Sequence, residues 1–183
     1  MPDLNGDGNN LIKAGDYSLT KLNLISTTSE KTIDITNIYT KIELFEDLFS
    51  PYMTGQIRMS DAFNIPELLP LTGQEIVEIE FKTAVENVDP VSKTFRVYKL
   101  DKHAFDRNGK GQQYTLHIIS EGGLINYANR CGYHVSGSVS DMIYKIVTKH
   151  FPSYLWEDKF ETESTKDKYS FVLPRSFTPF KAI

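Results

Sequence analysis

The sequence predicts a mainly β protein with some α-helix, in which an antiparallel β-barrel is followed by the start of a smaller α+β domain. Segments of alternating apolar and polar residues recur from residue 17 to residue 120, an Asn108-Gly109 step marks a hairpin, and helical periodicity appears only beyond residue 120. We therefore expect a flexible N-terminus at 1–16, a barrel domain at 17–120 and an incomplete second domain at 121–183.

Composition favours a globular protein and excludes several functional classes. The 183 residues are 40% hydrophobic and 12% aromatic, with a formal net charge of −4 and no basic stripe of the kind that nucleic-acid binders carry. The single cysteine, Cys131, excludes an internal disulfide. The sequence shows no signal peptide and no apolar run of the ~20 residues that span a membrane, so we expect a soluble protein made in the cytoplasm.

The barrel domain is expected to contain five or six strands. In chain order they are Tyr17–Ser26, Thr32–Phe45, Gly55–Asp61, Glu75–Thr83, Thr94–Phe105 and Gln112–Ser120. Glu75–Thr83 alternates most clearly: Val77, Ile79 and Phe81 fall on one face, and Glu78, Glu80 and Lys82 on the other. The last two strands flank the hairpin loop Asp106–Gly111.

The second domain is expected to be helical at first. A short helix fits within Ser120–Arg130, and a longer one over Val139–Phe151 begins at a cap on Ser138 or Ser140. The apolar stripe of the longer helix would be Val139, Met142, Ile143, Ile146 and Val147. Tyr169–Leu173 reads as a short strand. Thr178-Pro179 opens a helix that Ile183 ends within one turn, so we expect either that the chain is a fragment or that something else completes that helix.

No residue pattern indicates catalysis or a cofactor. Asp3, Asn5, Asp7 and Gly8 resemble half of a calcium loop, but Ala14 stands where a bidentate Glu is required, so a flexible polar segment is the simpler interpretation. The four histidines, His103, His117, His134 and His150, do not match metal-ligand spacing. We expect Cys131 to be buried and inert. The interpretation is a protein without enzymatic activity, metal or cofactor.

Two connections between strands are unusually apolar. The first runs from Phe45 to Met53 and the second from Phe63 to Leu71. They either cap the ends of the barrel or pack on another subunit, where aromatic residues and Met are enriched. The candidate interface residues are Phe45, Leu48, Phe49, Tyr52, Met53, Phe63, Ile65, Leu68 and Leu69.

Three motifs in this region carry a family resemblance. They are I-E-L-F-E-D-L-F-S (42–50), M-T-G-Q-I-R-M-S-D (53–61) and N-I-P-E-L-L-P-L-T-G-Q-E (64–75), and the terminal R-S-F-T-P-F-K-A-I (175–183) resembles a helix start. Over roughly residues 32–183 the chain resembles the baseplate hub protein of contractile-tailed bacteriophages. It is shorter than members of that family, and a second tube-like barrel is not seen, which suggests a fragment.

The resemblance implies a structural virion protein located in the tail baseplate. The barrel would be of tail-tube type, and a homotrimer would form a pseudo-sixfold ring that joins the tail tube protein to the central spike protein and contacts other baseplate proteins. Glu78, Glu80 and Lys82 are candidates for the face that lines the lumen, since a wall that passes DNA should not grip it. Specific nucleic-acid binding and a membrane span are not expected.

Two other functional classes stay open on the sequence. One is a phage-associated enzyme that degrades cell walls, which would require an acid–nucleophile pair or a metal triad. The other is a β domain that binds a ligand or carbohydrate, which would require a pocket with converging polar groups.

Overall fold

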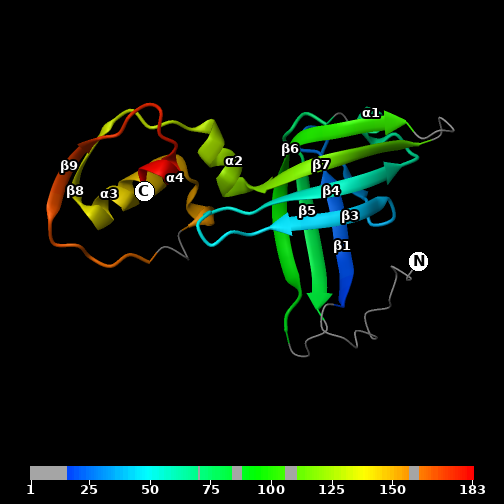
Figure 1. Cartoon of the computed structure of the whole chain (residues 1–183), viewed down its shortest axis with the longest axis horizontal. Helices are drawn as coiled ribbons and strands as arrows, with labels where there is room; N and C mark the ends of the chain where they lie inside the picture. Colours follow the sequence, from blue (N-terminus) through cyan, green and yellow to red (C-terminus); the bar gives the residue numbers. More distant parts are fainter. Residues whose placement is uncertain (1–15, 70, 84–87, 106–110, 157–160) are drawn as a thin grey trace. The chain divides into compact units, whose positions relative to one another are not determined.

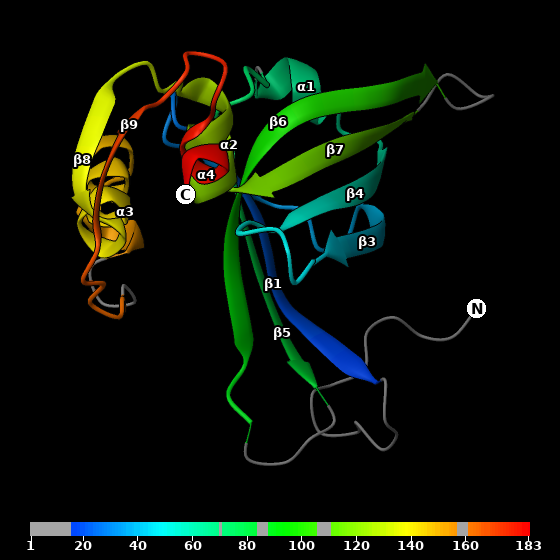
Figure 2. The ribbon, with the colours of Figure 1, turned by 60° about the vertical axis from the view of Figure 1, so that its left-hand side comes forward.

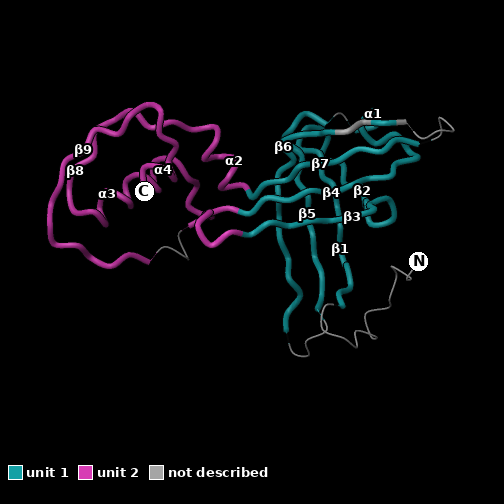
Figure 3. Tube along the Cα trace, viewed as in Figure 1, with its two compact units in different colours: residues 1–46, 53–120 teal, residues 47–52, 121–183 magenta. Residues whose placement is uncertain are grey.

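The computed structural model describes residues 16–69, 71–83, 88–105, 111–156 and 161–183. These residues form two compact units (Figure 1, Figure 3). Unit 1 holds the described residues up to Glu46 and from Met53 to Ser120, and unit 2 holds Asp47–Tyr52 and Glu121–Ile183. The connection at 47–52, which the sequence assigns to the barrel domain, thus clusters with unit 2. The flexible and calcium-loop predictions for the N-terminus lie outside the described residues, apart from Asp16.

Unit 1 is a seven-stranded antiparallel sheet in the order β2-β1-β5-β6-β7-β4-β3. The strands are β1 (Tyr17–Ile25), β2 (Thr32–Asp34), β3 (Tyr39–Phe45), β4 (Thr54–Asp61), β5 (Ile76–Thr83), β6 (Val91–Phe105) and β7 (Gln112–Ser120). A four-residue helix, α1 (Ile65–Leu68), lies between β4 and β5. The mainly β class with some α is confirmed. Each expected strand segment of this unit corresponds to one strand, except Thr32–Phe45, which is divided into β2 and β3.

The long strand β6 belongs to both halves of the sheet. Its first part, Val91–Arg96, pairs with β5, and its later part, Phe95–Phe105, pairs with β7. The β6–β7 register shifts twice, between Val97 and Lys99 and between Asp101 and Ala104. Such irregularities bend and twist a strand. Figure 2 shows β1 and β5 running beside one part of β6, while β7, β4 and β3 follow the other. The sheet is therefore a curled half-barrel.

The two edges of the sheet are joined by the short link 35–38. The Ile35 N–H donates to the Leu22 carbonyl of β1 at 2.9 Å, and the Ser60 N–H of β4 donates to the Ile38 carbonyl at 2.7 Å. The four residues of the link span at most ~14 Å, so the edges approach each other here. The prediction of one strand over Thr32–Phe45 is wrong, because the Asp34 carboxylate accepts the Thr36 N–H at 2.8 Å and turns the chain.

The core of unit 1 lies on the concave side of this sheet. It is formed by side chains from all parts of the unit, and its fully buried members include Leu22, Leu24, Ile35, Ile57, Val77, Ile79, Phe95, Leu116 and Ile118. Val77 and Ile79 are buried as the alternation in β5 predicts, and Phe81 packs against the same core. Period-2 patterning is thus what positions the core side chains.

Unit 2 contains α2 (Glu121–Ala128), β8 (His134–Ser138), α3 (Val139–His150), η1 (Ser153–Leu155), β9 (Lys168–Val172) and α4 (Pro179–Ala182). β8 and β9 form a two-stranded antiparallel sheet. The buried side chains of the unit are Cys131, Val135, Met142, Ile146 and Leu173. In the described part of the chain, no helix is both long and apolar enough to cross a membrane.

The start of α3 is fixed by Ser138 and not by Ser140. The Asp141 N–H donates to Ser138 Oγ at 3.2 Å, and the Ser138 N–H donates to the Asp141 carboxylate at 3.3 Å, which forms a capping box. Met142, Ile146 and Val147 are buried, as the helical stripe predicts. Val139 is exposed, because the first helical position lies beside the cap and faces away from the core.

Candidate partner-binding surfaces

The connection from β4 to β5 is shaped at its first end by a buried carboxylate. Asp61 is 1% exposed and accepts the N–H groups of Phe63 and Ile65, each at 2.7 Å. The Tyr114 hydroxyl also donates to Asp61, at 3.1 Å. Burial, followed by the charge of Asp61, raises the pKa of Tyr114. These bonds hold the chain in the turn that begins α1.

A second buried carboxylate closes the other end of this connection. Glu75 is 1% exposed and accepts the N–H of Thr72 at 2.6 Å, the hydroxyl of Thr72 at 3.1 Å and the N–H of Gly73 at 3.0 Å. Gly73 has a φ of 84°, which side chains rarely tolerate. The T-G-Q-E step noted in the sequence is therefore a loop closed by its own Glu.

The carboxylate-closed loop between Asp61 and Glu75 divides its apolar residues into two sets. Ile65 and Leu69 are 2% and 1% exposed and belong to the core of unit 1, so they offer no surface to a partner. Phe63 and Leu68 are 69% and 65% exposed. Of the four interface candidates in this loop, Phe63 and Leu68 are thus available for contact, and the interface role of these two stays a prediction.

The connection from β3 to β4 displays an apolar tip, which we define as Leu48 and Phe49. These side chains are 94% and 92% exposed. The turn beneath them is built by Asp47, whose carboxylate accepts the Phe49 N–H at 2.9 Å and whose carbonyl accepts the Ser50 N–H at 3.0 Å. The backbone is thus preorganised to present two adjacent apolar side chains to solvent.

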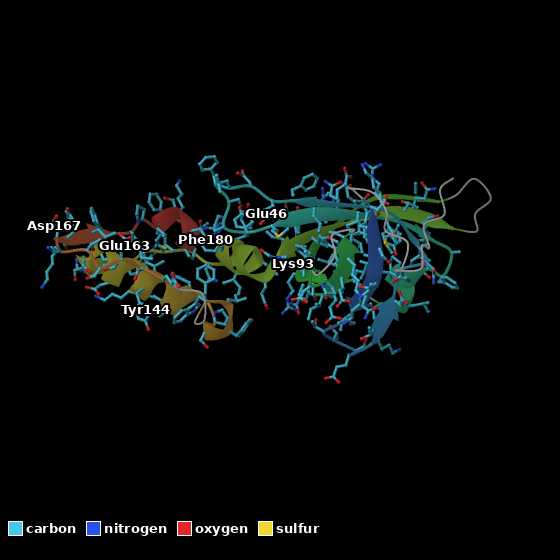
Figure 4. The ribbon with its side chains drawn as sticks, turned by 90° about the horizontal axis from the view of Figure 1, so that it is seen from below. Glu46, Lys93, Tyr144, Glu163, Asp167 and Phe180 are labelled. Carbon is cyan, nitrogen blue, oxygen red and sulfur yellow. The ribbon has the colours of Figure 1, made fainter. Side chains whose placement is uncertain are left out.

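Tyr52 anchors the apolar tip within unit 2. Its hydroxyl lies 2.7 Å from the hydroxyl of Tyr127, and its ring stacks on Phe180 of α4 with centroids 6.1 Å apart. Phe180 is labelled in Figure 4. The hydrogen bond with Tyr127, together with burial, raises the pKa of Tyr52 to about 12. Tyr52 therefore serves the unit's own packing.

Of the other interface candidates here, Met53 packs on the core of unit 1 and Phe45 is 51% exposed.

The polar face of β5 carries paired charges. Glu78 lies 2.6 Å from Lys21 Nζ, and this contact raises the pKa of Lys21. Glu80 accepts the Thr20 hydroxyl at 2.8 Å, and Lys82 is exposed. These residues lie on the strand face opposite Val77 and Ile79, as the alternation predicts. Whether they line a lumen stays a prediction.

The described residues show no arrangement suited to metal binding. Among them, no three His, Cys, Asp or Glu side chains are grouped closely enough to hold an ion. His117 is in register with Lys99, while the side chain of His103 lies outside the described residues. Cys131 is buried at 6% exposure, in agreement with its predicted core role.

A depression on unit 1 is one candidate for a small-molecule site. Its volume is about 360 Å³, and its lining includes Thr40, Arg58, Ser60 and Gln113. The lining contains no carboxylate, histidine or cysteine, so it offers neither an acid–base pair nor a nucleophilic thiol. Its polar groups are hydrogen-bonding groups and a single guanidinium.

Comparison with known proteins finds a similar fold only among solved structures. No protein-family model and no curated protein matches the chain. A chain of the lidded Francisella PdpA–VgrG complex matches with a TM-score of 0.52 and 11% identity, over 91% of this chain and 24% of that chain. The half-lidded form gives a TM-score of 0.47 at 13% identity, over 74% and 23% of the two chains. The lidless form gives 0.46 at 12% identity, over 76% and 25%.

The match to the lidded complex shows a shared fold. It extends over nearly the whole chain, so both units take part in the similarity. The chain spans about a quarter of the length of the solved chains that it matches. The molecule therefore combines a fold found in a PdpA–VgrG assembly with exposed apolar side chains on two ordered connections.

Proposed function

We propose that this protein is a structural subunit of a baseplate-type assembly, in which it associates with a spike-type partner. The observation that carries the proposal is the fold shared with a chain of the PdpA–VgrG complex over 91% of this chain. The exposed apolar residues on the β3–β4 and β4–β5 connections support it, because such residues mark protein contacts.

The more specific form of the proposal is a hub subunit of a contractile phage tail. In that role a homotrimeric ring joins the tail tube to the central spike, and the protein resides in the virion baseplate. The motifs at 42–75 support this form by their resemblance to baseplate hub proteins. The Asp61 and Glu75 bonds give those motifs a physical role, since both carboxylates fix the shape of a contact loop. We expect no enzymatic activity.

Localisation within the assembled particle tests this proposal. A small tag on an exposed residue, such as Asp89, is labelled with gold-conjugated antibody and imaged by electron microscopy. We expect the label at the baseplate end of the tail, coaxial with the tube. Label along the tube, on the capsid or absent from the particle contradicts the proposal. A lytic assay on purified cell walls and a glycan-binding screen address the enzymatic and carbohydrate-binding alternatives.

A further inference from the structure

The apolar tip of unit 2 lies within an acidic stretch of the chain. Glu46 and Asp47 directly precede Leu48 and Phe49, and no Lys or Arg occurs from residue 42 to residue 57. Both acidic residues are exposed. Each of the two apolar side chains of the tip is about 90% exposed, and both lie next to negatively charged residues. An anionic lipid surface is a poor match for such a tip, because membrane-binding segments pair apolar residues with Lys and Arg.

A second surface of unit 2 has the opposite charge, and we define it as the basic patch: Lys149, Arg175 and Lys181 with Tyr133 and Phe177. Lys149 Nζ lies 3.6 Å from the centroid of the Tyr133 ring, and Lys181 Nζ lies 4.8 Å from that of Phe177. The side chain of Arg175 packs against Gly132. All three cationic side chains are exposed, while the two rings are half-buried.

Backbone bonds hold the parts of the basic patch together. The Cys131 N–H donates to the Phe177 carbonyl at 2.8 Å, and the Leu173 N–H donates to the Tyr133 carbonyl at 2.9 Å. Tyr133 also contacts His150, with its hydroxyl 3.0 Å from Nε2. Burial lowers the pKa of His150, so the charge of the patch at neutral pH comes from Lys and Arg.

The described segments that build the basic patch are poor in acidic residues. In 129–156 and 168–183 the single acidic residue is Asp141. Asp141 lies in the first turn of α3, eight residues before Lys149, which places it ~12 Å away along the helix axis. The sequence did not reveal this patch, because its cations come from two distant segments that the fold brings together.

We propose that the apolar tip of one copy of this chain docks on the basic patch of a second copy. Glu46 and Asp47 complement Lys149, Arg175 and Lys181, while Leu48 and Phe49 pack against the half-buried rings of the patch. The two surfaces differ, so the contact is heterologous, and repetition around a rotation axis closes it into a ring. This inference rests on the proposed assembly role and names one contact of that role.

Complementation between two variants tests the contact. The tip variant is Leu48→Ser with Phe49→Ser, and the patch variant is Lys149→Glu with Lys181→Glu. Sedimentation velocity and light scattering measure the mass of each protein alone and of the mixture. We expect association of the wild-type chain that weakens with salt, monomers for each variant alone, and dimers for the mixture, because the mixture restores one intact contact per pair.

Matched controls separate this contact from general effects. Val88→Ser removes an exposed apolar side chain from unit 1 that belongs to neither apolar connection, and Lys31→Glu with Lys93→Glu makes the same change of charge. Both controls should associate as the wild type does. Circular dichroism verifies that all variants are folded.

Three outcomes overturn the inference. In the first, the wild-type chain stays monomeric at every concentration tested. In the second, the tip and patch variants associate as the wild type does. In the third, the mixture of the two variants fails to form dimers. A monomeric chain that binds a single-stranded oligonucleotide through Lys149 and Lys181 assigns the patch to nucleic acid instead. A tip variant that still localises to the baseplate rejects this contact and leaves the proposed function intact.

Discussion

At the scale of single residues, two buried carboxylates determine how the longest described loop of unit 1 presents its apolar side chains. Asp61 and Glu75 each accept three hydrogen bonds from groups in or beside the loop. Ionised acceptors make stronger bonds than neutral ones and are costly to leave incomplete. The Asp that ends the motif at 53–61 and the Glu that ends the motif at 64–75 therefore have a structural role.

Replacement of Asp61 by Asn should destabilise unit 1. An amide offers one oxygen acceptor, so its nitrogen would face N–H donors that the carboxylate now satisfies. We expect Asp61→Asn to lower the free energy of unfolding by about 3 kcal/mol, measured by urea denaturation. The control Asp89→Asn, at an exposed site, should change it by less than ~0.5 kcal/mol. Equal effects of the two substitutions would refute the role assigned to Asp61.

Tyr114 should make stability decline at alkaline pH. Its pKa is raised above the ordinary 10.0 by burial and by Asp61, so the unfolded chain releases this proton before the folded chain does. Unfolding is therefore favoured as pH rises above 10.0. Tyr114→Phe should show a shallower loss of stability between about pH 9 and pH 11 than the wild type, in parallel denaturant titrations. The pKa values of Tyr39 and Tyr133 are also raised, so these residues keep part of the decline in stability with pH in the Tyr114→Phe variant. An unchanged slope contradicts the prediction.

At the scale of elements, local sequence signals predicted the strands and α3 because each was self-contained. The alternation in Glu75–Thr83 and the Ser138–Asp141 cap each depend only on residues that are close together in the sequence. β8 was missed because H-V-S-G-S is polar and contains Gly, and α1 was missed because Asn64 precedes it in a left-handed conformation. The close approach at Gly55, where a Cβ would lie 2.7 Å from the Glu43 carbonyl oxygen, also depends on strand pairing.

The candidate surfaces were predictable only in part. Clustered apolar residues identified both connections, but burial separates Ile65 and Leu69 from Phe63 and Leu68. That separation depends on bonds to Asp61 and on packing against distant strands, which no local pattern encodes. The basic patch depends on contacts between 131–133 and 173–177. The net charge of the whole chain is −4, so composition does not reveal this local positive charge.

Loss of the α3 cap should weaken unit 2. Ser138→Ala removes the acceptor for the Asp141 N–H, so we expect a loss of about 1 kcal/mol in the free energy of unfolding. The Ser138 bonds lower the pKa of Asp141, so the cap contributes above the ordinary value of 3.8 and loses its contribution as pH falls below it. Ser170→Ala, at an exposed strand position, serves as the comparison. Hydrogen exchange of the α3 amides reports the change, and equal protection in wild type and Ser138→Ala rejects it.

At the scale of the whole molecule, the two units each expose apolar residues on an ordered scaffold. Unit 1 curls so that the short link 35–38 joins its two edge strands, and unit 2 presents a tip and a patch of opposite charge. Curled sheets with short edge strands such as β2 limit uncontrolled pairing, while specific surfaces direct assembly. This combination suits a subunit that repeats around an axis.

The mass and symmetry of the assembled species test the central claim most directly. The measurement is light scattering of the purified protein, followed by cryo-electron microscopy of the same sample with its tube and spike partners. We predict a trimeric ring coaxial with a tube, with the apolar tip at a contact between subunits. A protein that remains monomeric with those partners, or that forms only a twofold dimer, contradicts the proposed assembly role.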